Sequence, residues 1–463
     1  MPTQIQVPFG KESFSITVPV AVDVMSIKPP LPLSDVRSAT IAALSAPIGT
    51  PPLSEIIRHK GDPRQLTVTI AVSDITRPIP YRGSNGIILP LLAELREAGI
   101  ARERVTIIVA TGMHRASTAE EKRAILGSDV ARRYRVVDHE CDAPDALLPV
   151  GTTADGTAVA VNRYYAEAGV KICTGLVESH FMAGFSGGRK SICPGLVDSR
   201  TLQRFHGPHF LEDPRTDNLQ LAANPCHEEA LAVARQAGCD FLLNVAVDQH
   251  YRVTGVYAGD MEEAHARACA DVAAAVRIPL SHRYDIVITH GGYVGINHYQ
   301  TAKTGCSALP ALKPRGCLLI VACHTEADPL GSPEYRTLLH LLRLQGPDGY
   351  TALLKSPSWS FTRDQWEPQM WARVLRHVRQ EGLIYVSPQL RAEDCALIPG
   401  FCGQSFLPEV GGDHQPVQAA QAMLQAALAR LVAQHRGQYG TDPCIAFLAD
   451  GPYGIPISPA EAA

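Results

Sequence analysis

Short runs of β-branched and aliphatic residues alternate with stretches of helical periodicity along most of this chain. The helical spacing is clearest at 87–98 and 261–276. Such alternation is typical of α/β units around mainly parallel sheets. The strand-like runs lie at 66–72, 105–110, 170–173, 285–289, 317–322 and 383–386.

The two ends of the chain carry further elements. Alternating apolar positions at 5–9 and 13–18 predict an opening hairpin, and a helix at 416–434 precedes a last strand at 444–448. A proline ends the Ala-rich helix within 276–283, where we expect the domain boundary. The sequence therefore predicts an α/β fold of two domains with mainly parallel sheets, 1–278 and 283–412, whose intervening cleft holds the active site. We expect the tail, 413–463, to pack back on the N-terminal domain.

Composition narrows the class of protein. The chain has 463 residues, 19% of them charged, with a formal net charge of −4, which favours a globular protein and excludes one that coats nucleic acid. Neither a leader sequence nor an apolar run of about 18 residues is present, so we expect a cytoplasmic protein without a membrane partner. The 12 cysteines form no C-x-x-C pair and are expected to be reduced and mostly buried.

Polar loops follow four of the predicted strands. In open α/β sheets ligands bind beyond the carboxyl ends of the strands, so these loops are expected to meet at one site. A single Arg or Asp there is often only a helix cap or a surface ion pair. Two histidines at separate strand ends favour proton transfer, because imidazole takes up and returns protons near neutral pH. The loops are 73–78, 111–115, 178–191 and 290–293.

The glycine-rich stretch 184–191, GFSGGRKS, is similar to a phosphate-binding P-loop but differs at the residue directly before its Lys-Ser pair. A P-loop needs glycine directly before Lys-Ser, and Arg189 stands there. The loop could still hold a mononucleotide phosphate, with Arg189 as a bidentate fork and Lys190 as a point charge or covalent attachment site. The alternative is a surface turn with solvated cations.

Four motifs occur in an order that identifies a family. They are SDITRP at 73–78, TGMHR at 111–115, ESHFMAGFSGGRKSICPG at 178–195 and NHYQTAKTG at 297–305. Together they resemble the nickel-dependent lactate racemase family. The resemblance implies inversion at C2 of a small 2-hydroxy acid by hydride transfer through a 2-oxo acid. It also implies transient contact with cofactor-synthesis enzymes.

The resemblance assigns a cofactor and its ligands. The family's nickel-pincer nucleotide is a pyridinium-3-thioamide-5-thiocarboxylic acid mononucleotide, which here would be covalently bound to Lys190. Its nickel is held by two sulfurs, one ring carbon and a histidine, which matches His206, sixteen positions after Lys190. Further cofactor-binding residues implied are Asp74, Ser186, Gly187, Gly188, Arg189 and Trp366, although Trp359 and Trp371 lie close to the last.

The resemblance also assigns the catalytic and substrate residues. His114 and His180 match the family's two catalytic histidines, which would serve opposite faces of the substrate. Arg77 would hold the substrate carboxylate. Tyr299, Gln300 and Lys303, from the second domain, would complete substrate binding.

One departure from the family leaves the substrate's side chain open. Many members have Pro-Leu-Asp in the loop where this chain has Tyr293-Val294-Gly295, followed by His298. His298 either selects a polar or dicarboxylic substrate or is a solvent-facing helix residue. Two other functions stay open, a non-catalytic nucleotide- or metal-binding paralogue and an NAD-dependent 2-hydroxy acid dehydrogenase. No G-x-G-x-x-G follows a predicted strand, which disfavours the dehydrogenase.

Overall fold

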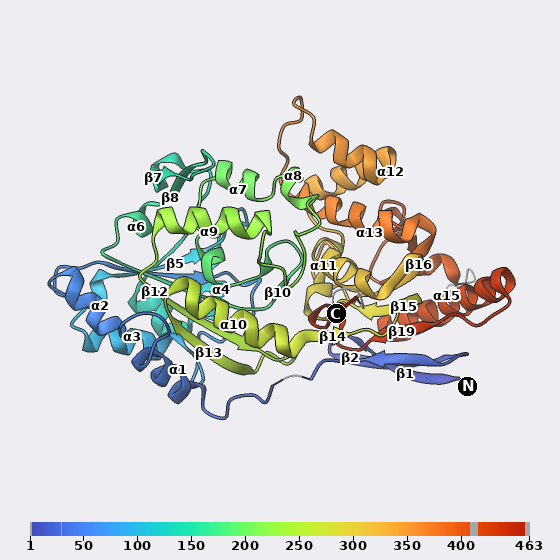
Figure 1. The fold of residues 1–463 in the computed structure, drawn as a ribbon, viewed down its shortest axis with the longest axis horizontal. Coiled ribbons are helices and arrows are strands. Elements are labelled where there is room, and N and C mark those ends of the chain that lie inside the picture. The colour runs from blue at the N-terminus through green and yellow to red at the C-terminus, as the bar shows by residue number, and fades with distance from the viewer. Residues whose placement is uncertain (1, 29, 408–414, 459–463) are drawn as a thin grey trace. The chain divides into compact units, whose positions relative to one another are not determined.

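The computed structural model describes residues 2–28, 30–407 and 415–458 (Figure 1). The chain forms two compact units, here called the first unit, Pro29–Ala275, and the second unit, which combines Met1–Lys28 with Val276–Ala463.

The first unit is built on a six-stranded sheet in the order β13-β12-β9-β4-β5-β6. All neighbouring strands are parallel except β12 and β13, which are antiparallel. The chain runs from β4 outward through β5 and β6, then returns to the other side of β4 as β9, so the strand order reverses between β4 and β9. The strands are β4 (Val68–Ser73), β5 (Val105–Ala110), β6 (Arg135–Asp138), β9 (Val170–Leu176), β12 (Phe241–Val247) and β13 (Val253–Gly259).

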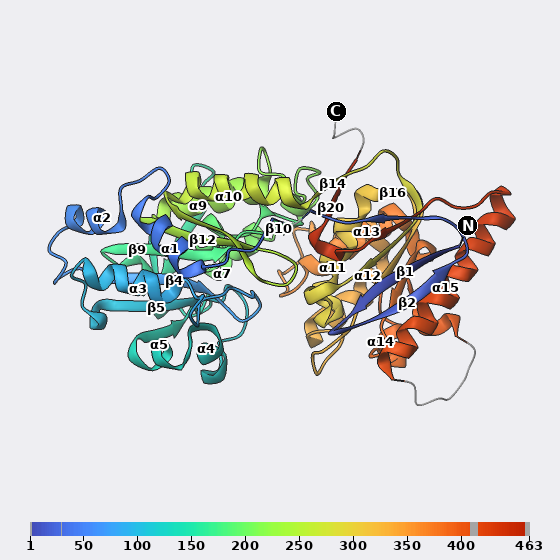
Figure 2. The same ribbon diagram turned by 90° about the horizontal axis from the view of Figure 1, so that it is seen from below.

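Helices cover both faces of this sheet, as parallel strands require. Leu44 of α1, Ile57 of α2 and Leu91 of α3 join one core with the strand residues Ile70 and Ile107. Figure 2 shows α9 and α10 on the face opposite α3. The helices are α1 (Val36–Ser45), α2 (Leu53–Lys60), α3 (Ile88–Glu97), α4 (Ala119–Leu126), α5 (Ser128–Arg133), α6 (Arg163–Ala166), α7 (Ser199–Phe205), α8 (Pro208–Leu211), α9 (Pro225–Ala237) and α10 (Met261–Val276).

Two small antiparallel pairs and three 3₁₀ segments complete the first unit. They are β7 (Leu147–Thr152) with β8 (Ala158–Asn162), β10 (Ser179–His180) with β11 (Gly184–Phe185), η1 (Arg102–Arg104), η2 (Pro144–Ala146) and η3 (Gly188–Ser191).

The second unit has a six-stranded, fully parallel sheet in the order β18-β17-β16-β15-β19-β3. Its strand order reverses between β15 and β19. The strands are β3 (Val22–Met25), β15 (Tyr284–His290), β16 (Leu312–Val321), β17 (Leu383–Val386), β18 (Phe401–Cys402) and β19 (Ile445–Leu448); β14 (Arg277–Pro279) pairs in parallel with β20 (Ile455–Ile457).

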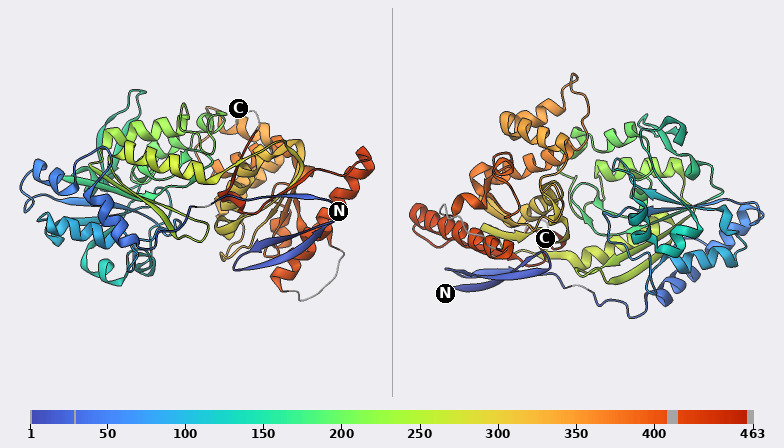
Figure 3. Two further views of the ribbon diagram at one scale, coloured as in Figure 1. Left: turned by 60° about the horizontal axis from the view of Figure 1, so that its bottom comes forward. Right: turned by 180° about the vertical axis from the view of Figure 1, so that it is seen from behind.

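The opening hairpin packs on the long helix α15 of the same unit (Figure 3). The Gln421 side chain donates to the carbonyl of Ser15, and the Thr17 amide donates to the Gln425 side chain. The remaining elements are β1 (Thr3–Phe9), β2 (Glu12–Val18), α11 (His298–Ala308), α12 (Pro333–Leu354), α13 (Trp366–Gly382), α14 (Ala392–Cys395), α15 (Pro416–Tyr439), η4 (Gly292–Ile296), η5 (Leu309–Ala311), η6 (Gly403–Phe406) and η7 (Gly451–Tyr453).

The predicted fold class is confirmed, because both large sheets are mainly parallel and connected by helices. The predicted strand runs each fall within an observed strand or overlap it, and the hairpin and the C-terminal helix are present. These elements carry strong local patterns, which is why the sequence located them.

The predicted membership of the chain ends is wrong. β19 lies between β15 and β3 in the second sheet, so neither 1–28 nor the described part of 413–463 belongs with the first unit. The physical reason is that β19 hydrogen-bonds on both edges, closing the gap between β15 and β3. β3 and β19 have only four residues each, so their sequences give no local indication of which sheet they join. Residues 413–414 and 459–463 lie outside the described part.

The cysteines differ from the expectation at one pair. A disulfide joins Cys395 and Cys402, which corrects the expectation that every cysteine is reduced. Most of the free cysteines are buried, as expected.

Among the described residues, no helix combines the length and the apolar content that crossing a membrane requires.

Removing residues 1–28 should unfold the second unit and leave the first unit folded. Six hairpin residues, Ile5, Val7, Phe9, Phe14, Ile16 and Val18, join the core beneath α15. At about 1.5–3 kcal/mol for each buried side chain, their loss is comparable to the roughly 5–15 kcal/mol that stabilises a whole domain. Calorimetry of the truncated chain should show only the transition of fragment 29–275. Two transitions at the full-length temperatures would contradict this.

Candidate active site

Three polar loops leave the carboxyl edge of the first sheet beside the reversal of strand order. Asp74 follows β4 directly, His114 follows β5, and His180 follows β9. In the sheet β5 and β9 flank β4, so the two histidines leave strands that are two positions, or about 10 Å, apart. This edge is where open α/β sheets bind ligands.

Asp74 and His114 form a hydrogen-bonded pair. The carboxylate Oδ2 of Asp74 lies 2.6 Å from Nδ1 of His114, and Oδ1 accepts bonds from the amide and hydroxyl of Thr76 at 3.1 and 2.6 Å. Burial alone would raise the pKa of Asp74, but the bonds from His114 and Thr76 and the charge of Arg77 outweigh it and lower the pKa. The carboxylate therefore keeps the ring proton of His114 on Nδ1 and leaves Nε2 as the basic nitrogen.

His180 is held by backbone amides, where His114 is held by a carboxylate. His180 is 8% exposed, and its Nδ1 accepts bonds from the backbone amides of Met182 and Ala183, each at 3.2 Å. Nε2 of His180 lies 3.1 Å from Nζ of Lys190. A charged Lys190 donates to this nitrogen, whereas a neutral ring whose Nδ1 accepts carries its proton on Nε2, so the protonation of His180 depends on that of Lys190.

Lys190 and His206 lie together beside the ring of Phe205. Nζ of Lys190 is 5.2 Å from the centre of that ring, and His206 meets its edge at 4.8 Å. Nδ1 of His206 lies 3.2 Å from the carbonyl oxygen of Leu202, to which it donates. Burial and the nearby charge of Lys190 lower the pKa of His206 to about 3. His206 is therefore a neutral imidazole whose Nε2 lone pair can bind a metal.

Arg77 lies near the same edge and is partly exposed. Its Nε is 3.8 Å from a carboxylate oxygen of Glu178, the residue two positions before His180. At this distance the pair is a weak ion pair rather than a hydrogen bond. The guanidinium of Arg77 can therefore turn toward an anionic ligand at little cost.

The glycine-rich loop faces the interior rather than an open anion site. The amide of Gly188 donates to the Asn244 side chain at 2.9 Å, and the hydroxyl of Ser186 donates to the Leu176 carbonyl at 2.7 Å. A Cβ on Gly187 would lie 2.7 Å from Val177, and one on Gly188 would lie 2.5 Å from the ring of His265. Close packing and positive φ, rather than a phosphate, explain why these two residues are glycine.

Arg189 does not act as the expected phosphate fork. Its side chain is 1% exposed and donates to the carbonyl of Ala183 at 2.7 Å, with His265 at 3.2 Å. Burial lowers the pKa of Arg189 to about 10, so it keeps its charge at neutral pH. The terminal nitrogens of Arg189 hold the loop from behind through these bonds, while its buried Nε has no hydrogen-bond partner among the described residues. The cofactor-binding role expected for Ser186, Gly187, Gly188 and Arg189 stays a prediction, and the contacts described here show that these residues also support the loop.

Asn244 and His265 are residues that the sequence did not single out. Asn244 lies within β12 and His265 within α10, both distant in sequence from the loop they hold. The imidazole of His265 lies 2.9 Å from the carbonyl of Ser186. A buried polar residue inside an apolar strand was the one available signal for Asn244.

In the second unit, helix α11 positions the predicted substrate residues. Asn297 caps the helix by accepting the Gln300 amide at 2.7 Å. One turn later the Lys303 ammonium donates to the Gln300 side chain at 2.7 Å, and the ring of Tyr299 packs edge-on against Tyr335 at 5.2 Å. Because α11 follows β15 through η4, these residues lie at the carboxyl edge of the second sheet, beside its reversal of strand order.

Both predictions for His298 are wrong. It is 0% exposed, stacks on Trp371 at 4.7 Å, and shares a 2.9 Å hydrogen bond with the hydroxyl of Tyr335. Burial lowers its pKa well below the usual value. It is a neutral histidine in the core that supports α11, so it neither faces solvent nor contacts a substrate.

Trp366 begins α13 and is buried. Its ring stacks on Phe361 at 6.1 Å. The buried carboxyl of Glu367, the next residue, was not predicted, although its position beside a singled-out tryptophan was a signal.

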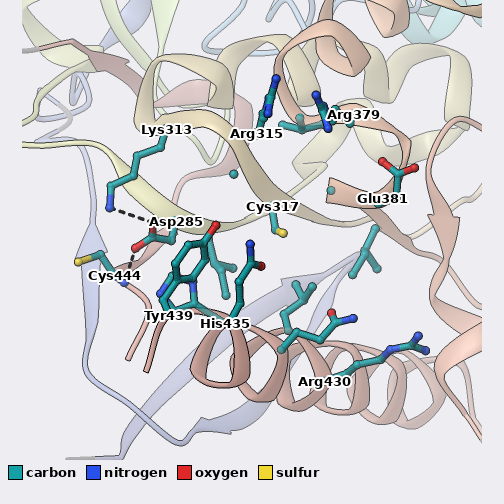
Figure 4. A pocket seen from close by; sticks show the side chains of 18 of the residues that line it. Asp285, Lys313, Arg315, Cys317, Arg379, Glu381, Arg430, His435, Tyr439 and Cys444 are labelled. Atoms are coloured by element: carbon teal, nitrogen blue, oxygen red, sulfur yellow. Dashed lines mark hydrogen bonds and ion pairs between the residues drawn. The ribbon is translucent and has the colours of Figure 1, made fainter. Parts of the chain in front are cut away.

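A groove of about 1430 Å³ in the second unit lies away from all of these residues. It opens at the amino ends of β15, β16 and β17, between Lys313, Arg315, Arg379 and the end of α15 (Figure 4). None of the predicted site residues lines it. Ligands in parallel α/β sheets bind at the opposite edge, so we assign the chemistry to the carboxyl edge.

The residues of the first unit fit the cofactor that the motifs imply. A covalent link needs a primary amine, and Lys190 is half-buried beside a neutral histidine, His206. The implied nickel takes one protein ligand and three cofactor donors. This is compatible with the finding that the described residues contain no group of three or more His, Cys, Asp or Glu arranged to hold a metal ion.

Comparison with known proteins places the chain in a family. The family described as lactate racemase N-terminal domain matches residues 9–218. A lactate racemase of Lactiplantibacillus plantarum is 32% identical over 347 residues, which are 74% of this chain and 78% of that protein. A lactate racemase of Thermoanaerobacterium thermosaccharolyticum is 30% identical over 379 residues, which are 80% of this chain and 85% of that protein.

Solved structures agree with this placement. The lactate racemase apoprotein from Thermoanaerobacterium thermosaccharolyticum matches with a TM-score of 0.80 and 26% identity, covering 98% of this chain and 100% of that one. A Thermotoga maritima protein shares the fold at a TM-score of 0.63 and 17% identity, covering 93% of this chain and 99% of that one. The resemblance drawn from the four motifs is confirmed: the chain belongs to the lactate racemase family of isomerases.

Proposed function

We propose that this protein inverts C2 of a small 2-hydroxy acid, with lactate as the first substrate to test. The observation that carries the proposal is the placement of His114 and His180 after strands that flank β4, with Nδ1 of His114 against a carboxylate and Nδ1 of His180 against two backbone amides. Inversion requires chemistry at both faces of C2, and a group on each side of the substrate meets this requirement.

His114 is the general base in the resting arrangement. Its Nε2 can take the hydroxyl proton of one enantiomer, and the resulting imidazolium keeps Nδ1–H bonded to the Asp74 carboxylate. A charge of opposite sign at 2.6 Å stabilises the imidazolium, as in other carboxylate–histidine pairs. Asp74 therefore orients the base and supports its charge.

His180 serves the other face. With Nδ1 accepting from the amides of Met182 and Ala183, a neutral His180 carries its proton on Nε2 and can donate it to a hydroxyl or carbonyl oxygen of the substrate. It becomes a base once its proton moves to Nδ1, which requires the ring to leave the amides of Met182 and Ala183. The two histidines thus start from different protonation patterns. They exchange the roles of base and acid between the D-to-L and the L-to-D reaction.

Moving the C2 hydrogen needs a further group, because a proton at C2 beside an ionised carboxylate is only weakly acidic. When bound, a nickel-pincer nucleotide would supply an acceptor and donor of hydride for C2. Lys190 would anchor it and His206 would bind its nickel, with the loop 184–189 holding Lys190 in place. Trp366 and Asp74 remain proposed neighbours of the cofactor.

The substrate carboxylate needs cationic partners that do not take part in proton transfer. Arg77 is suited to this because its pairing with Glu178 is loose at 3.8 Å. Lys303, held by Gln300, is proposed as the second partner, with Tyr299 beside it. That the residues of the second unit serve the same substrate as the histidines stays a prediction, as does the cleft.

Single variants of the two histidines should stop racemisation by different routes. His114→Ala and His180→Ala should each lower kcat by roughly 10²–10⁴-fold, the usual effect of losing a general base. In single-turnover mixing with separate D and L substrates, His114→Ala should fail to react with one enantiomer, and His180→Ala should fail to react with the other. His250→Ala, at an exposed loop position, is the matched control and should behave as wild type. Near-normal racemisation by either active-site variant would rule out the two-sided mechanism.

Variants of the anchor and the metal ligand should separate covalent attachment from metal binding. On co-expression with cofactor-synthesis enzymes, intact mass should rise by one cofactor in wild type and not in Lys190→Ala. His206→Ala should keep the mass increment and lose nickel, since its imidazole is the proposed ligand. The controls are Lys122→Ala, whose ammonium pairs with Asp138, and His209→Ala, at an exposed position of α8. A mass increment that survives in Lys190→Ala would show that the anchor is another residue.

A further inference from the structure

The hydroxyl of Tyr81 stands where two strands of the first sheet separate. The parallel pairing of β4 with β9 ends at Ala71 and Cys173. Each strand runs on past that point, β4 to Ser73 and β9 to Leu176. Tyr81 follows β4 in the loop before α3, and its side chain is 1% exposed. A buried hydroxyl needs hydrogen-bond partners, and Tyr81 has them on both strands.

The direction of each hydrogen bond at this hydroxyl can be assigned. A hydroxyl has one hydrogen to donate, and Thr174 donates its own to the carbonyl of Ala71 at 2.7 Å. Tyr81 therefore donates to Oγ1 of Thr174 at 2.8 Å, and its oxygen accepts from the amide of Ser73 at 3.0 Å. Burial raises the pKa of Tyr81, so the hydroxyl keeps its hydrogen at neutral pH. One side chain thus bridges β4 and β9 beyond the end of their ladder.

The two ends of this bridge lead to the two halves of the candidate site. The amide at one end belongs to the residue before Asp74, whose carboxylate lies 2.6 Å from His114. At the other end, the carbonyl of Thr174 accepts from the hydroxyl of Ser191 at 2.8 Å, and Ser191 directly follows Lys190. A change in the spacing of the two strands would therefore move the carboxylate–histidine pair relative to the lysine.

We propose that Tyr81 is a positioning residue, whose hydroxyl fixes the separation of β4 and β9 and thereby the distance between His114 and His180. This rests on the proposed function, in which both histidines act on one substrate. Tyr81 acts through the strands and not on the substrate. Reacting groups must be held to within about 0.5 Å of their productive geometry, and a fully satisfied buried network supplies such rigidity.

The kinetic test uses Tyr81→Phe, which keeps the ring in the core and removes the bridge. In cofactor-loaded enzyme, kcat should fall by roughly 10- to 100-fold, because a misplacement on the order of 1 Å can cost 10²-fold. KM should stay within about twofold, since the bridge serves the transition state and not uniform binding of the substrate. In single-turnover mixing both enantiomers should react more slowly, in contrast to the variants of either histidine. A kcat near that of wild type would overturn the proposal.

The matched control is Tyr165→Phe. Tyr165 is also a fully buried tyrosine of the first unit, and its hydroxyl donates to the carbonyl of Gly238 at 2.7 Å. Both variants lose one buried hydroxyl and should lower the melting temperature, whereas only Tyr81→Phe should lower kcat. An equal loss of kcat in Tyr165→Phe would show that general destabilisation, and not the bridge, is responsible.

Thr174 gives a second route to the same bond. Thr174→Ser retains the hydroxyl that accepts from Tyr81 and should keep kcat within about twofold of wild type. Thr174→Val removes that hydroxyl and should lose activity as Tyr81→Phe does. The double variant, Tyr81→Phe with Thr174→Val, should be no slower than the slower single variant, because both changes break one bridge. Losses that multiply in the double variant would contradict the proposal.

Hydrogen exchange of the apoprotein tests the bridge without cofactor or turnover. In Tyr81→Phe the amide of Ser73 loses its acceptor, so exchange in a peptide covering 68–76 should be faster by roughly tenfold, as for the loss of one hydrogen bond. Tyr165→Phe should leave this peptide unchanged. Unaltered exchange in Tyr81→Phe would refute the bridge. Failure of loaded wild type to racemise lactate would instead refute the proposed function, so the two failures are distinguishable.

Discussion

The parallel arrangement of β9, β4 and β5 is the constraint on which the active edge depends. Parallel strands end at one edge of a sheet, and the change of direction between β4 and β9 prevents a helix crossover from covering that point. Asp74, His114 and His180 leave the sheet at this edge from three adjacent strands. Their separate positions in the chain become one set of neighbours only because the strands are hydrogen-bonded in this order.

The glycine-rich loop depends on buried polar contacts behind it. Arg189, Asn244 and His265 hold its backbone from the interior, and the resulting path brings Lys190 to 3.1 Å from His180. A loop built to cradle phosphate would keep its amides free for the ligand, whereas the Gly188 amide is used internally. Precise placement of one lysine is therefore the better physical explanation of this sequence.

The second unit also has its candidate residues at the edge of a parallel sheet where the strand order reverses. Its reversal of strand order lies between β15 and β19, and α11 follows β15 at that edge with Gln300 and Lys303 on its first turns. Beneath α11 lies an apolar and aromatic support that includes His298 and Trp371, and beside it the buried Glu367. Buried titratable groups on both sides of α11 show that its surroundings are not a simple hydrophobic core.

The sequence by itself determined the fold class, most strands, the family and the candidate residues, because these depend on local periodicity and on motifs of neighbouring residues. The tertiary structure decided what depends on distant partners. It placed the opening hairpin in the second unit and β3 and β19 in that unit's sheet, turned Arg189 inward and buried His298, which no local pattern shows. The protonation patterns of His114 and His180 were decided in the same way, since a ring nitrogen takes its role from whichever carboxylate or amide lies against it.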